Sequence, residues 1–178
     1  MSVREHVRRG VAAYFGGPLD PEDPAGSIYR PGPLLPYGLA TVRAYAGRPR
    51  QPDTDFTTGL EPGAMGARLT VGLATTTERR ITTGGWKALI FQVTLGLEAI
   101  GTAPNPELAQ AEVDGLLEAI VALVRADPAL GGIVLQAGEG QRGIVTTCSE
   151  PLFDGGSSRL TITASVAFDA DYYLEVPT

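Results

Sequence analysis

The chain is poor in the residues that carry most enzyme chemistry. It has one histidine, His6, and one cysteine, Cys148, among 178 residues. A metal site or a Ser-His-Asp triad would depend on that single imidazole, which lies in a predicted helix without any ligand spacing around it. A lone cysteine forms no intrachain disulfide, which suits a reducing compartment, and we expect Cys148 to be a buried strand thiol. The sequence therefore predicts no enzyme, no metal site and no cofactor.

Long apolar runs and an excess of basic residues are also missing. No segment approaches the roughly 18 apolar residues of a membrane span, and no apolar stretch follows the first charged residues. We therefore expect neither a signal peptide nor membrane association. The formal net charge is −6, which argues against binding nucleic acid by neutralising phosphates. A surface past which DNA slides without sticking remains compatible with that charge.

Three short patterns resemble functional motifs by their letters only. Residues 138–143 read G-x-G-x-x-G, but a strand-like stretch follows where a dinucleotide site needs a helix, so we interpret them as a loop. Residues 155–158, Gly-Gly-Ser-Ser, lack the G-x-S-x-G pattern of a nucleophile elbow and indicate a hairpin loop. The acidic residues at 20–23 and 53–55 lack the spacing of a calcium loop and are interpreted as solvated.

The strongest pattern predicts a long β-hairpin over residues 68–100. Apolar residues alternate through its second strand, which places them on one buried face. Gly84 and Gly85 supply the positive φ angles of a tight turn. Both strands exceed the usual length of about 5–6 residues, so we expect the tip at 82–86 to project beyond the sheet. Trp86 is then either a packed tip residue or an interface anchor. The alternating residues are Leu89, Phe91, Val93, Leu95 and Leu97.

The remaining patterns predict an α+β fold in a single domain, residues 1–178. Helices are expected over residues 3–15, with Ser2 and Glu5 as a capping box, and over residues 106–126, with Asn105 as N-cap and Pro106 at the first position. We expect a mostly antiparallel sheet with the long hairpin, and two helices packed on one face. Proline makes residues 16–38 an extended segment, and residues 47–66 form a long loop. The other predicted strands cover residues 38–46, 133–135, 143–148 and 159–168, the last paired with a strand before the turn at 154–156.

Several of these stretches together resemble the tail-terminator and minor-tail proteins of long-tailed bacteriophages. They are the hairpin end Gly84-Gly85-Trp86-Lys87, the strand at 89–97, and the helix that runs into the D-x-x-L-G-G turn at 127–132. The resemblance covers the order of elements over residues 3–168, with 18–36 and 47–66 as insertions. It implies a ring, usually of six subunits, that caps the tail tube, ends its polymerisation and joins the tail to the head connector.

The resemblance also implies partners and a location. The partners are other copies of the chain, the major tail tube protein and a head-completion or connector protein. The location is the head-proximal end of the virion tail, after assembly in the host cytoplasm. Two alternatives stay open: a tail-tube or head–tail connector subunit of the same fold group, and a non-viral small-molecule-binding α+β domain.

The ring implied by the resemblance requires particular properties of the surface that faces its axis and of the surfaces between subunits. We expect the surface that faces the ring axis to be acidic or neutral, so that DNA passes through without binding. We expect the hairpin tip and the long loop to contact another subunit rather than their own core. The candidate interface residues are Arg48, Arg50, Phe56, Met65, Arg79, Arg80 and Trp86.

Overall fold

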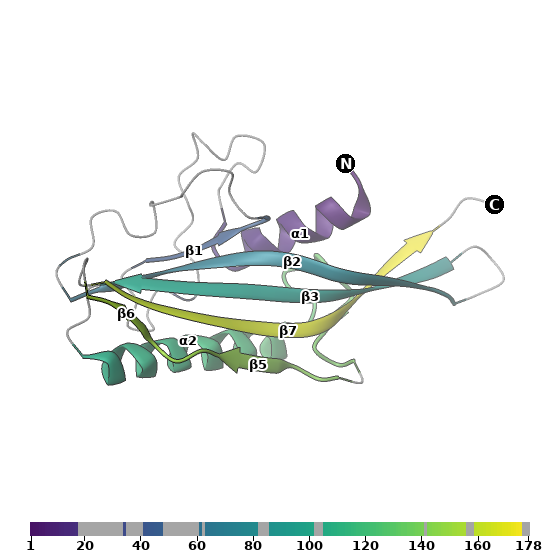
Figure 1. Ribbon diagram of the computed structural model, residues 1–178. Coiled ribbons are helices and arrows are strands. Elements are labelled where there is room, and N and C mark those ends of the chain that lie inside the picture. The colour runs from purple at the N-terminus through teal and green to yellow at the C-terminus, as the bar shows by residue number, and fades with distance from the viewer. Residues whose placement is uncertain are drawn as a thin grey trace.

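The computed structural model describes residues 1–17, 34, 41–47, 61, 63–81, 86–101, 105–140, 142–155 and 159–175. Within these residues the chain forms two helices and one curled sheet of seven strands (Figure 1). The architecture is compatible with the α+β class predicted from the sequence. In chain order the elements are α1 (Val3–Tyr14), β1 (Thr41–Tyr45), β2 (Met65–Arg80), β3 (Trp86–Gly101), α2 (Pro106–Ala126), β4 (Gln136–Ala137), β5 (Val145–Cys148), β6 (Leu152–Asp154) and β7 (Arg159–Glu175).

The sheet is built around three long strands. β3 pairs antiparallel with β2 on one side and with β7 on the other, so that Trp86 lies opposite Glu175 and Gly101 lies opposite Leu160. β1 adds to β2 in parallel. The other edge of β7 is shared by three short antiparallel strands in succession: β6, then β5, then β4. Together these short strands cover most of that edge between Arg159 and Asp171.

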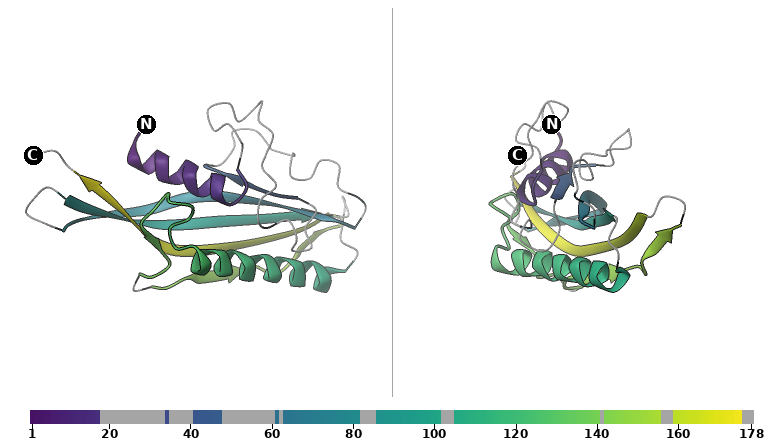
Figure 2. Two further views of the ribbon diagram at one scale, coloured as in Figure 1. Left: turned by 180° about the vertical axis from the view of Figure 1, so that it is seen from behind. Right: turned by 90° about the vertical axis from the view of Figure 1, so that its left-hand side faces the viewer.

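One face of the sheet carries the hydrophobic core. The predicted alternation in β3 is confirmed, because Phe91, Val93, Leu95 and Leu97 are all buried. The facing residues of β2 and β7 belong to the same core, and both helices contribute to it. Seen from behind, α1 and α2 both lie in front of the sheet (Figure 2, left), with α1 against β1 and β2 and α2 against β7. The helical contributions include Val7, Val11 and Phe15 from α1, and Val113, Leu116 and Ile120 from α2.

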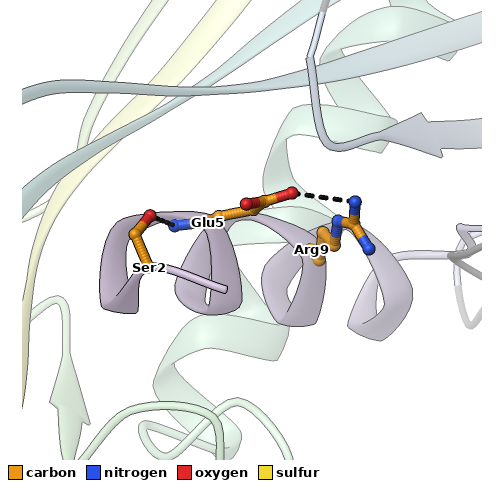
Figure 3. A network of polar contacts seen from close by, with 3 residues as sticks. All are labelled: Ser2, Glu5 and Arg9. Carbon is orange, nitrogen blue, oxygen red and sulfur yellow. Dashed lines mark hydrogen bonds and ion pairs between the residues drawn. The ribbon is translucent and has the colours of Figure 1, made fainter.

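Both predicted helix starts are confirmed. The Ser2 hydroxyl accepts a hydrogen bond from the Glu5 backbone N–H at 3.2 Å. The Glu5 carboxylate turns away from the cap to pair with Arg9 at 2.8 Å, so half of the predicted capping box forms (Figure 3). At the start of α2, the Asn105 side chain accepts from the Glu107 N–H at 2.9 Å. These bonds satisfy backbone donors that a helix start would otherwise leave unpaired.

Three sequence predictions need correction. The last strand continues beyond Phe168 to Glu175, because the alternation continues through buried Ala170 and partly buried Tyr172, with Asp169 and Asp171 on the other face. The predicted strand at 133–135 is wrong: those residues belong to a turn, and the short strand β4 follows them. Cys148 is exposed rather than buried, because β5 lies at the edge of the sheet, where all four of its residues are exposed.

The D-x-x-L-G-G turn joins α2 to the sheet through strained backbone. Leu130, Gly131 and Gly132 all have positive φ, at 48°, 71° and 85°. Leu130 is fully buried, so its burial offsets the strain of a left-handed conformation at a non-glycine residue. The Asp127 carboxylate accepts from the Gly131 N–H at 2.8 Å. Asp127 also raises the pKa of Tyr14 in α1, after the larger effect of burial, so this turn links both helices.

We expect Asp127→Ala to lower the free energy of unfolding by about 1–2 kcal/mol, since it leaves the Gly131 N–H without its acceptor. Urea unfolding measures this change, and Glu118→Ala on the exposed face of α2 is the control. The variant should also bring the pKa of Tyr14 closer to 10.0. A loss in stability no greater than that of the control would show that the bond does not hold the turn.

Candidate assembly interface

A β-bulge in β2 marks the start of a projecting segment. Leu73 lies opposite Val93, but Thr76 lies opposite Phe91, so two residues of β2 face the single residue Gln92. A bulge bends its strand and increases the local twist. The N-terminal end of α1 reaches this point, where Arg4 donates to the backbone C=O of Leu73 and to the Thr76 hydroxyl. Beyond the bulge, β2 is exposed along its whole length.

We call this projecting segment the arm, and it consists of residues 76–81, 86–91 and 170–175. Its three strands extend together toward the end of the molecule where β7 finishes (Figure 1). On its inner face, Leu89 and Tyr172 pack partly against the core, and the His6 ring meets Tyr172 edge-on at 6.3 Å. The Lys87 ammonium pairs with the Glu78 carboxylate on the same face. The inner face is therefore partly occupied by the chain itself.

The outer face of the arm carries an exposed apolar cluster. Register places Arg79, Ala88 and Tyr173 in one row across the three strands. Ile81 donates its N–H to the Trp86 C=O at 3.0 Å, which places these two residues in the adjacent row. Ile81, Trp86 and Tyr173 are 44%, 41% and 45% exposed, and we call them the arm patch. Large apolar side chains that gather on one exposed face are typical of a binding surface.

The structure separates the predicted interface residues into three groups. Trp86, Arg79 and Arg80 lie exposed on the arm, and their contact with another subunit stays a prediction. Met65 was wrongly assigned to an interface: it is fully buried in the core, because it begins β2 on the same face as Ala67 and Leu69. Arg48, Arg50 and Phe56 lie outside the described residues. The predicted tip turn at Gly84 and Gly85 also lies outside them, as does most of the two segments at 16–38 and 47–66.

Three further exposed apolar side chains lie toward the opposite end of the sheet, and the sequence patterns did not predict them. Leu152 and Phe153 of β6 are 67% and 63% exposed, and Leu108 in the first turn of α2 is 62% exposed. Phe153 lies opposite Leu160, which lies opposite Gly101, and α2 begins shortly after Gly101. We call Leu108, Leu152 and Phe153 together the flank patch, within which Leu152 and Phe153 are consecutive in β6 and point to opposite faces of the sheet. A β6 strand of only three residues was too short to distinguish from a turn by its pattern.

The strand next to the flank patch has an open edge. Ser149 donates its N–H to the Thr163 C=O at 2.8 Å. Bonded residues alternate in an antiparallel pair, so Thr146 and Cys148 of β5 direct their backbone groups away from β7. In the part of the chain that the structure describes, no further strand pairs with β5 or β6. Such edges readily accept a strand from another chain.

Two carboxylates stand side by side where the arm joins the sheet. The pKa of Asp171 is raised, first by burial and then by the charge of Asp169 two residues before it. The folded state therefore favours the protonated form of Asp171, which stabilises the fold fully below its ordinary value of 3.8. This stabilisation is lost as the pH rises through the raised value.

We accordingly expect Asp171→Asn to raise the melting temperature at pH 7 more than at pH 4. Thermal unfolding followed by circular dichroism at the two pH values measures the difference. Asp114→Asn, on the exposed face of α2, is the matched control. Equal shifts at both pH values would mean that the Asp171 charge does not oppose folding.

A surface depression lies beside the loop that resembles a nucleotide-binding motif. Its volume is about 460 Å³, and Arg125, Glu139 and Ile144 line it together with the backbone of Gly138 and Gly140. The loop leads into β5 and not into a helix, which agrees with the interpretation made from the sequence. Glu139 places a carboxylate where a phosphate would have to bind. Among the described residues, no group of three or more His, Cys, Asp or Glu side chains could hold a metal ion.

Comparison with known proteins adds no family to these observations. No protein-family model matches the chain, and no curated protein sequence matches it significantly. Within the described residues, neither helix combines the length and apolar character needed to cross a membrane. The arm patch and the flank patch are therefore the surfaces on which a functional proposal rests.

Proposed function

We propose that this protein is a structural subunit of a phage tail, and specifically a tail terminator. Its copies form a ring without enzymatic activity that caps the tail tube, ends its polymerisation and joins the tail to the head connector. The partners are other copies of the chain, the major tail tube protein and a connector protein. The fold supports this proposal, because it has two helices on one face of a mostly antiparallel sheet and a long hairpin. The tail-terminator family, which residues 84–97 and 116–134 resemble, has the same kinds of element.

The observation that carries the proposal is the arm with its exposed apolar patch. A monomer gains little from three strands that outrun the core, because residues 74–80 of β2 bury almost nothing. The strands hold a tryptophan, a tyrosine and an isoleucine on one face, and tryptophan and tyrosine are enriched where protein interfaces bind most strongly. An arm of this kind suits a subunit that reaches over a neighbour.

A tail-tube or connector subunit would use the same arm, and the position in the virion distinguishes these from a terminator. A small-molecule-binding domain has less support. Ligand sites are usually concave and mostly apolar, whereas charged Arg125 and Glu139 and the loop backbone line the depression at 138–143.

Removal of the gene from the phage that encodes it tests the proposal. We expect particles without this protein to yield tails of abnormal length that do not join heads, as seen by negative-stain electron microscopy. A plasmid copy of the gene should restore joined tails of uniform length. Normal virions in the absence of the protein would contradict a role in tail completion.

A further inference from the structure

We propose that the free edge of β5 binds an extended segment of a different protein, which adds to the sheet as a further strand. Thr146 and Cys148 direct their backbone N–H and C=O groups away from β7, because the bonded pairs fall at the alternate residues. Within the described part of the chain, no backbone group pairs with them on that side. Main-chain hydrogen bonds supply the affinity when a strand adds to a sheet edge. The proposal concerns this edge alone and goes beyond tail completion.

β5 lacks the features that usually protect an edge strand from pairing with another chain. Natural edge strands are blunted by charged side chains or proline. Residues 144–148, Ile-Val-Thr-Thr-Cys, contain neither, and four of the five are β-branched, which favours extended backbone. By contrast, the arm edge of β2 carries charges at 78–80, β1 carries Arg43, and Pro151 precedes β6. The unprotected edge of β5 is therefore suited to a partner strand.

The side chains on both sides of this edge suit small and β-branched residues in the partner. Val145 is 48% exposed on the outer face of the sheet, where an added strand would cover it. On the inner face, beside α2 (Figure 1), the Gln110 amide donates to the Cys148 sulfur at 3.1 Å. Side chains directly opposite each other in neighbouring strands have Cβ atoms about 4.5–5.5 Å apart. A bound strand would therefore also shield the Cys148 thiol.

Charges at the two ends of β5 favour one direction of the bound strand. Acidic side chains lie beside Cys148, whereas two arginines and one glutamate lie beside Ile144. Complementary charges fix the register and orientation of a partner, and antiparallel pairing is the slightly more stable kind. We therefore expect a partner segment with a base at its amino-terminal end and an acid at its carboxyl-terminal end. The acidic residues beside Cys148 are Asp114, which accepts from Gln110, and Glu150; the charged residues beside Ile144 are Arg125, Glu139 and Arg142.

Alkylation of Cys148 reports whether this edge is occupied, because the chain has a single cysteine. The probe is the peptide acetyl-Lys-Val-Thr-Val-Thr-Glu-amide. We expect it to slow the reaction of Cys148 with iodoacetamide by about tenfold at about ten times its Kd, because about one site in eleven is then empty. The peptide with Lys and Glu exchanged should bind several-fold more weakly, since its charges face like charges in an antiparallel pair.

Backbone recognition is tested separately from side-chain packing. N-methylation of the peptide amides that face β5 should abolish protection, whereas N-methylation of the amides that face away should not. Thr146→Pro removes an outward N–H and should weaken binding by about tenfold. Thr146→Val keeps this N–H and should bind like the wild type. Circular dichroism melts show whether both variants fold, and the methylated peptides test the wild-type chain if Thr146→Pro does not fold.

Three results would overturn the proposal. The first is a lack of protection at about 5 mM peptide, where a contact of millimolar affinity would be occupied. The second is equal binding of the two kinds of methylated peptide. The third is a Cys148 thiol that becomes protected as the concentration of the protein alone rises, because β5 would then pair with a second copy. Normal tails in the deletion experiment would refute the tail function and leave a positive peptide result standing.

Discussion

Trp86→Ala is expected to leave the monomer folded and to abolish its assembly. The indole is 41% exposed on the outer face of the arm, so its removal should change the free energy of unfolding by less than about 1 kcal/mol. Burying the same side chain against a neighbour contributes on the order of 2 kcal/mol or more. Its loss should weaken each contact by roughly 30-fold, and a ring repeats that loss at every contact.

Two measurements separate the effects of this substitution. Urea unfolding reports the stability of the monomer, and sedimentation velocity reports association. In phage carrying the variant, tails should be incomplete or of abnormal length. Leu135→Ala is the matched control, because Leu135 is also exposed but lies outside both patches. If Trp86→Ala unfolds while the surviving fraction assembles normally, Trp86 is a core residue and the arm is not an interface.

Phe91→Ala should have the opposite effect and destabilise the fold by about 3–5 kcal/mol. Phe91 is 1% exposed and packs on the inner face of β3, five positions from Trp86. This loss is a large share of the roughly 5–15 kcal/mol that stabilises a typical domain. Phe153→Ala offers a matched control with the same change of side chain at a 63% exposed site.

Urea unfolding of these two phenylalanine variants tests the assignment of core and surface. The Phe153 variant should unfold within about 1 kcal/mol of the wild type, because its side chain is already 63% exposed in the folded chain. Similar losses of stability in both variants would show that β6 is part of the core.

The sequence correctly predicted those helix starts and strands that depend on residues close together in the chain. Both helix starts depend on a single polar side chain next to the first turn, and Ser2 and Asn105 supply it. The hairpin strands follow from strict alternation, since each core residue of β3 has a polar or small neighbour. The length of both strands also predicted a projecting tip, but the pattern left Trp86 open between a packed tip residue and an interface anchor.

The errors have a common physical origin in tertiary contacts. Met65 lies in a stretch rich in glycine and proline, and only its pairing with Gly101 shows that β2 begins there and faces the core. The exposure of Cys148 depends on the position of β5 at the sheet edge. The exposure of Phe153 depends on the place of β6 at the edge of β7, where Phe153 pairs with Leu160, and no local pattern reveals that pairing.

Native mass spectrometry of purified tails or tail complexes tests the central claim most directly. The proposal predicts a closed ring of this chain, with six copies as the expected number, at the end of the tail that joins the head. A strictly two-fold dimer in the assembly, or tails that lack the protein altogether, would contradict it.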